Sequence, residues 1–258
     1  MLTFNSLQLT ILISNFFWPM VRILSFFSAA PIFNDTLINK KNKIVLSGMI
    51  SWLIFPFLPE IHAELFSCFG FLLLLQQILI GIVLGFTAQL LFVTVNLSGE
   101  IIGLQMGLSF ATFFSSSSHI GTSIISRLLN ILSLLFFLVL NTHLYLISIL
   151  IDSFYSMPID GYFLNTNVFF ILLKFSSYIF LNSILFVLPI MIILLSLSFV
   201  MSLLNRLSPQ ISIFSIGFPL NLIVGILVLY FLIPVTFPFF EKILNGLIIF
   251  IKNTFLHI

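Results

Sequence analysis

Long apolar runs separated by short polar segments dominate the chain. Six runs stand out, and they cover residues 7–33, 44–59, 65–98, 128–151, 175–204 and 211–240. Runs of about twenty apolar residues are typical of helices that cross a membrane. The pattern therefore predicts an all-α membrane protein with about six apolar helical segments joined as hairpins.

The runs differ in length. Residues 128–151 form a normal span of about 36 Å as a helix, 44–59 is short, and 65–99 would make a helix of about 50 Å. Tilting accommodates such mismatch, and so does packing against protein in place of lipid. The last run should be kinked or broken because several helix breakers lie in it or just before it: Pro209, Gly217, Pro219, Gly225, Pro234 and Pro238.

Composition excludes a soluble fold, because 60% of the residues are hydrophobic and only 6% are charged, against about 25% charged in soluble domains. The net charge of +2 has no basic cluster beyond residues 40–43 and offers nothing to nucleic acid. One cysteine, Cys68, excludes an intramolecular disulfide. No cleavable signal is expected, because Arg22 follows the start of the first apolar run.

Charge also predicts a multi-pass topology. If residues 34–43 face the cytoplasm, alternation places 99–127 and 205–210 on the same side. The connecting segments then satisfy the positive-inside rule. The basic residues on that side are Lys40, Lys41, Lys43, Arg127 and Arg206, and the acidic residues opposite are Glu60, Glu64, Asp152 and Asp160.

A ladder of small residues recurs every four positions: Gly99, Gly103, Gly107, Ala111 and Ser115. If the segment is helical, these residues form a shallow groove for another backbone. Each glycine costs a helix about 1 kcal/mol relative to alanine, which indicates a packing need. Similar spacings arise by chance, and we interpret the pair Gly81 and Gly85 in that way. Three glycines in phase favour close helix packing.

Polar residues accompany the ladder. Glu100, with Gln105 nearby, has three interpretations: a structural hydrogen-bond or ion-pair node, a solvated residue at the membrane boundary, or a proton-relay group. A second polar node, Arg206 and Gln210, lies between the last two runs. With Pro209 beside it, this node is read as a hairpin turn whose arginine reaches the interface.

Four apolar residues, Met106, Phe110, Phe113 and Phe114, precede a loop of serines at 115–118. Such residues form pore constrictions in some channels. In a chain with 34 Phe residues, ordinary lipid-facing side chains are the preferred interpretation. The histidines lack metal-site spacing, and no catalytic motif is present. We expect no metal, no cofactor and no enzymatic activity.

Several of these motifs resemble a known family. Residues 99–111 are very similar to the central signature of the FliR family of flagellar type III export-gate subunits. Further matches follow in family order over roughly 98–225, at 127–129, 143–144, 152–158, 209–214 and 217–220. The chain departs from the usual pattern at Ser115-Ser116 (normally Asp-Pro), Thr142 (normally Gly) and Ser212 (often Asn).

The resemblance implies one copy of this chain in a helical assembly with several FliP and FliQ subunits, working with FlhA and FlhB. That assembly lies in the inner membrane at the flagellar basal body and admits unfolded rod, hook and filament proteins. The chain would form a single domain, 1–258, with residues 1–165 resembling FliP and 166–258 resembling a FliQ hairpin. Residues 110–119 would plug the closed channel.

Two alternatives remain at this point. The homologous subunit of a virulence injectisome would have needle and effector genes nearby instead of hook and rod genes. A small-solute secondary transporter would use Glu100 as its coupling group and should show an inverted repeat, which the sequence lacks. An intramembrane enzyme is more distant, because the chain carries no nucleophile–base pattern.

Overall fold

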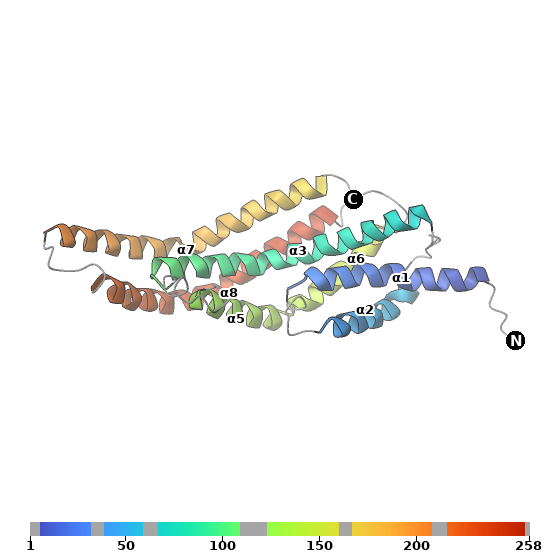
Figure 1. Ribbon diagram of the computed structural model, residues 1–258, viewed down its shortest axis with the longest axis horizontal. Helices are drawn as coiled ribbons and strands as arrows, with labels where there is room; N and C mark the ends of the chain where they lie inside the picture. The colour runs from blue at the N-terminus through green and yellow to red at the C-terminus, as the bar shows by residue number, and fades with distance from the viewer. Residues whose placement is uncertain are drawn as a thin grey trace. The chain divides into compact units, whose positions relative to one another are not determined.

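The computed structural model describes residues 6–31, 39–58, 67–108, 123–159, 167–207 and 216–255. Over these ranges the chain is almost entirely helical and contains no strand (Figure 1), which confirms the all-α prediction. The elements are α1 (Ser6–Ala29), α2 (Lys40–Ile54), a 3-10 turn η1 (Phe55–Phe57), α3 (Cys68–Gln105), α5 (Ile124–Val139), α6 (Thr142–Ser156), α7 (Asn167–Leu207) and α8 (Phe218–Phe255).

Four of the described helices are long and apolar enough to cross a membrane. They are Leu12–Ala29 of α1, all of α3, Ser176–Leu207 of α7 and Phe218–Lys252 of α8. The consecutive helices α5 and α6 pass the same test only as a broken pair. The chain is therefore a multi-pass membrane protein.

The prediction of one uninterrupted helix over 128–151 is wrong. Helix α5 ends at Val139 and α6 begins at Thr142. Between them Asn141 has φ 51°, in the left-handed region. Asparagine tolerates this conformation better than most residues. A uniformly apolar run does not reveal such a break, because hydropathy is insensitive to one backbone angle.

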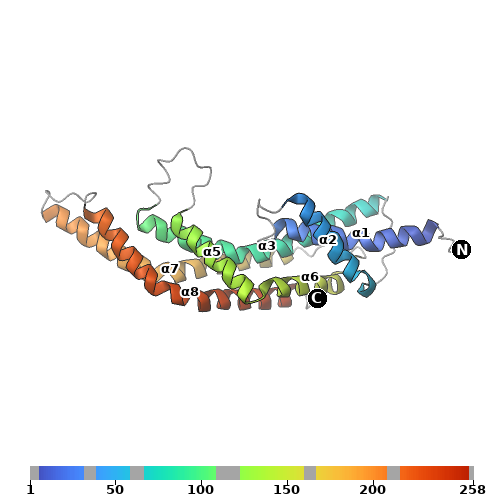
Figure 2. The ribbon, with the colours of Figure 1, turned by 90° about the horizontal axis from the view of Figure 1, so that it is seen from below.

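Other boundaries also moved. Helix α3 continues to Gln105, so the predicted loop over 99–127 begins later, and the first part of the glycine ladder is helical. Helix α8 runs unbroken through Pro234 and Pro238, and Figure 2 shows it changing direction along its length. The predicted kink is present in α8, whereas the predicted break is not.

The chain packs as two compact units, each described by itself. Unit 1 comprises Met1–Leu90, Asn141–Phe175 and Leu247–Ile258, and unit 2 comprises Leu91–Leu140 and Ser176–Gly246. These boundaries concern packing within this chain. The division of the chain into 1–165 and 166–258 concerns resemblance to FliP and FliQ, and it stays a prediction.

In unit 1, α1 lies against the first half of α3, with α2 beside α1 (Figures 1 and 2). At Gly85 an added Cβ would lie 2.7 Å from the Phe26 carbonyl oxygen and 2.8 Å from the Ala29 Cβ, and Gly81 is as close to the same helix. The glycine pair that we interpreted as chance is therefore a close helix contact. Small residues at such contacts let backbones approach.

In unit 2, α7 and α8 run antiparallel. Tyr178 faces Gly246, and Phe186 stacks on Phe239 at 4.2 Å between ring centroids. Further along, the Asn221 amide donates to Ser198 Oγ at 3.4 Å. A cluster of aromatic rings from α3, α5 and α8 fills the space beside this hairpin: Phe92, Phe136, Phe137, Phe237 and Phe240.

Candidate functional site

The end of α3 meets the start of α5 in unit 2, and most of the predicted site residues that the structure describes lie there. Helix α3 ends in a left-handed glycine, Gly107, with φ 81°. The Gly107 N–H donates to the Leu104 carbonyl, and the Leu108 N–H donates to the Gly103 carbonyl, both at 3.0 Å. This pair of bonds is the Schellman ending of a helix.

The glycine ladder is helical only in part, so the condition on which its predicted groove rested, a helix that continues through Gly107, is not met. Its first two members, Gly99 and Gly103, are buried in α3, whereas Gly107 terminates the helix. The reason is conformational, because glycine adopts positive φ without the steric cost that a Cβ imposes. Ala111 lies outside the described residues.

At Gly99 the helices α3 and α5 approach each other closely. A Cβ at this position would overlap the backbone of Ser126. Ser126 in turn donates from Oγ to the Asn96 carbonyl at 3.2 Å and also contacts the Asn96 side chain. Next to Gly99 on α3, the Ser98 hydroxyl donates to the Ser183 carbonyl of α7, and the Ser183 hydroxyl donates to the Thr94 carbonyl one turn before Ser98. Small and polar residues thus join α3 to two neighbours.

Glu100 forms a hydrogen bond to the start of α5 in this arrangement. Its Oε1 accepts the backbone N–H of Ser123 at 3.0 Å, and Ser123 is the N-cap residue of α5. The Ser123 hydroxyl accepts the N–H of Ile125 at 3.2 Å. In a capping box a glutamate three residues into the helix takes the N-cap N–H. Here that position holds Ser126, and the carboxylate comes from α3.

The geometry also explains why an acidic residue is suitable beside the amino end of α5. The amino end of a helix carries unsatisfied N–H groups and a partial positive charge. A half-buried carboxylate at that end accepts a hydrogen bond and complements the charge. This hydrogen bond is the one that the interpretation of Glu100 as a hydrogen-bond node requires, and that interpretation stays a prediction.

Met106 is fully buried within this chain, at 0% exposure. Its side chain packs on α8, where a Cβ added to Gly225 would lie 2.6–2.9 Å from three Met106 atoms. Met106, a candidate for a constriction, is thus part of the core of unit 2, and the preferred lipid-facing interpretation does not hold for its side chain. The other three, Phe110, Phe113 and Phe114, lie outside the described residues.

The remaining polar candidates are not brought together with Glu100 by any described contact. Gln105 is the partly exposed last residue of α3, and Arg206 is exposed in the last turn of α7. A cation in the last turn complements the helix dipole. Gln210 lies outside the described residues.

Arg22, in unit 1, is a structurally important residue that sequence reasoning missed. It lies within the candidate span of α1 and is 0% exposed. Its Nε donates to Gln77 Oε1 at 2.7 Å, while its terminal nitrogens donate to the Ser153 and Met157 carbonyls, each at 2.8 Å. The guanidinium also lies 4.3 Å from the centre of the Phe154 ring.

These partners form a specific site for a cation. Ser153 and Met157 belong to the carboxyl end of α6, which carries unpaired carbonyl groups and a partial negative charge. The planar guanidinium has donors enough to bond several of these groups and a ring face at once. A single positive charge inside an apolar run was the available signal. From the sequence alone, Arg22 bore only on the absence of a cleavable signal.

The same contacts give one family-like motif a physical role. Residues 152–158 matched the family pattern, and within them Ser153, Phe154 and Met157 surround Arg22. Asp152 is exposed. Within the described ranges, no group of three or more His, Cys, Asp or Glu residues is placed to hold a metal ion.

Comparison with known proteins places the chain in a family. Residues 13–247 match the family described as bacterial export proteins, family 1. The chain is 80% identical over all 258 residues of both chains to the flagellar biosynthetic protein FliR of Buchnera aphidicola subsp. Acyrthosiphon pisum (strain APS).

More distant relatives carry the same name. The chain is 48% identical to FliR of Escherichia coli (strain K12) over 230 residues, which are 89% of this chain and 88% of that protein. It is 23% identical to FliR of Bacillus subtilis (strain 168) over 237 residues, or 90% and 91% of the two chains. The chain belongs to the bacterial export proteins, family 1, as a member of the FliR family, and is a component of the flagellar export apparatus.

Proposed function

We propose that this chain is a subunit of the flagellar type III protein export gate in the inner membrane. It joins FliP and FliQ to form the channel that admits unfolded rod, hook and filament proteins, with FlhB and FlhA as further partners. The proposal is supported by the signature at 99–111 and by relatives whose names state flagellar biosynthesis.

One structural observation carries the assembly part of this proposal. Exposed apolar side chains extend along α7 from Leu173 to Leu207, a length of about 51 Å at 1.5 Å per residue. A tilt of 40° still leaves about 39 Å along the membrane normal, against about 30 Å of hydrocarbon. Lipid does not cover the whole length of this surface, so neighbouring protein subunits are the expected cover for the rest.

The proposal extends to the parts of the chain. Helices α7 and α8 form an antiparallel hairpin, which fits the proposed FliQ-like part over 166–258. Gly99 packs closely on Ser126 of α5, and close packing at the buried Gly103 belongs to the proposal. Channel closure by residues around 110–119 also belongs to the proposal. Of the four candidate side chains for this closure, the structure describes Met106.

Complementation tests the proposal. The chain is expressed in Escherichia coli that lacks its own FliR, and hook and filament proteins are measured in the culture medium. Affinity purification from the same membranes should recover FliP and FliQ. If secretion is restored but neither FliP nor FliQ is found in the purified complex, the proposed channel assembly is overturned. If there is neither secretion nor co-purification of FliP and FliQ, the whole proposal is overturned. A small-solute transporter would restore no secretion.

Gly103→Leu sharpens the test, because a bulky side chain near the end of α3 should prevent association with FliP and FliQ. The amount of the variant in the membrane must match the wild type, so that loss of association is separated from loss of folding. Normal co-purification of this variant would remove the packing argument.

A further inference from the structure

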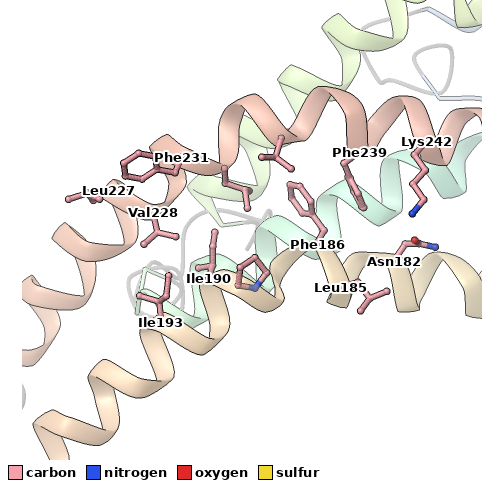
Figure 3. A pocket seen from close by; sticks show the side chains of 13 residues that line it. Asn182, Leu185, Phe186, Ile190, Ile193, Leu227, Val228, Phe231, Phe239 and Lys242 are labelled. Carbon is pink, nitrogen blue, oxygen red and sulfur yellow. The ribbon is translucent and has the colours of Figure 1, made fainter.

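A groove of about 680 Å³ lies between α7 and α8 in unit 2. Figure 3 shows its walls, with Ile190 and Ile193 on α7 opposite Val228 and Phe231 on α8. Almost all of the lining is apolar. The exception is one end, where Asn182 and Lys242 lie close together (Figure 3).

Proline residues account for the opening of the groove. Pro189 lines it on α7, and α8 contains Pro234 and Pro238 at the corresponding level. A proline inside a helix removes one backbone hydrogen bond and bends the axis away from its own ring. Two bent helices in contact at the stacked rings of Phe186 and Phe239 leave a hollow beside that contact.

The polar end is built from one buried and one exposed side chain. Asn182 is 6% exposed, and its amide donates to the Tyr178 carbonyl at 2.7 Å. Lys242 is exposed, with its ammonium directed toward Asn182 in Figure 3. Glu241 precedes it on α8 but does not line the groove, because adjacent helical residues point in different directions.

Lys242 also has the depth expected of an interfacial residue. Helix α8 and the turn before it carry no charged residue from Ile216 to Phe240, which is about 37 Å of helix. That length covers a hydrocarbon core of about 30 Å. Lys242 therefore follows a membrane-length apolar stretch, at the level where lipid phosphates lie.

We propose that this groove binds an anionic phospholipid, with one acyl chain between α7 and α8 and the phosphate on the Lys242 ammonium. From Lys242 to Leu227 the groove follows α8 for about 22 Å, enough for the chain of one leaflet, which spans about 15 Å of hydrocarbon. A cation at one end and apolar walls elsewhere match an amphiphile. This site does not depend on the proposed export function.

Native mass spectrometry of the complex purified from membranes tests the site, with phosphatidylglycerol as the added lipid. Lys242→Gln should lower its affinity about fivefold, as expected for one basic residue beside an anionic headgroup. Lys252→Gln, on the same helix outside the groove, is the matched control and should leave the affinity unchanged.

Filling the groove gives a second variant pair. Ile193→Trp should reduce the bound lipid, whereas Ile192→Trp, at an exposed neighbouring position outside the lining, should not. Equal lipid binding by Lys242→Gln, Ile193→Trp and the two controls would overturn the proposal.

A photoreactive phenylalanine at Ile193 decides the question even where a variant fails to fold. In the assembled complex it should attach to lipid. Attachment to a protein subunit instead would assign the groove to a partner helix and overturn the lipid site.

Discussion

In each compact unit a charged residue of one helix meets the end of another helix, and the polarity of that end is opposite to the charge. In unit 1, Arg22 meets the carboxyl end of α6, and in unit 2, Glu100 meets the amino end of α5. Both helix ends carry partial charges that the side chain complements. The same electrostatic rule therefore operates twice, with cation and anion exchanged.

The two sites differ in burial and in the number of contacts. Arg22 is completely buried and bonds to α3 and α6 as well as a ring face, whereas Glu100 is half-buried and accepts one backbone N–H. A buried polar group costs more to leave unpaired than an exposed one. We therefore expect Arg22 to contribute more to stability than Glu100.

The largest expected effect is that of Arg22→Met. The substitution fills similar space but leaves Gln77 and two carbonyls without their donor, at a cost of about 3 kcal/mol in the free energy of unfolding. Thermal unfolding of the purified protein in detergent measures the loss. Arg206→Gln, at an exposed cation, is the control and should change stability by less than about 0.5 kcal/mol. Equal effects of the two variants would break the comparison.

The second largest effect is expected for Gly85→Ala, which should lower the free energy of unfolding by about 2 kcal/mol, because the new Cβ would force α1 and α3 apart. Gly48→Ala is the control, since its Cβ would meet only the Phe16 ring at 4.0 Å. In that position alanine should be neutral or stabilising by up to about 1 kcal/mol. If Gly85→Ala also stabilises, the close contact in unit 1 is incorrect.

Gly107→Ala should cost about 1 kcal/mol, because an L-residue is strained at positive φ. Gly107→Asn should lower the free energy of unfolding by less than Gly107→Ala does, since asparagine adopts positive φ more readily. The two melting temperatures, compared in the same detergent, report on the helix end beside Glu100. A larger loss for asparagine than for alanine would contradict the left-handed ending of α3.

Glu100→Gln should have the smallest effect and lower the free energy of unfolding by about 0.5 kcal/mol. Glutamine keeps an acceptor for the Ser123 N–H but loses the charge. The difference should shrink at high salt, which screens a half-exposed charge. Glu241→Gln on α8 is the exposed control. A loss that equals the effect of Arg22→Met would show that burial does not separate the two sites.

Much of the fold followed from the pattern of residues. The long apolar runs predicted an all-α membrane protein, and the residues at 99–111 predicted the family that the comparisons show. Both predictions rest on local composition and order, which do not depend on three-dimensional contacts. The α7 and α8 segments were also recognised, with different bounds. The predicted runs 175–204 and 211–240 correspond to helices at Asn167–Leu207 and Phe218–Phe255.

Other features depended on single backbone angles or on long-range contacts. The break at Asn141 and the helix ending at Gly107 each follow from one residue in the left-handed region, which hydropathy does not record. Glu100 was a candidate from the sequence, but its hydrogen-bond partner Ser123 lies 23 residues further along the chain, at the start of another helix. The lipid groove depends on how bent helices pack, and no linear motif marks it.

By itself, the sequence determined that this protein is helical, lies in a membrane and belongs to the export family, because apolar length and signature residues act locally along the chain. Only the tertiary structure decided which glycines form close contacts and where Arg22 finds its partners. Gly81 and Gly85 look no different from a chance pair until α1 lies against α3. Arg22 is an isolated charge until the end of α6 supplies carbonyl groups from 131 and 135 residues away.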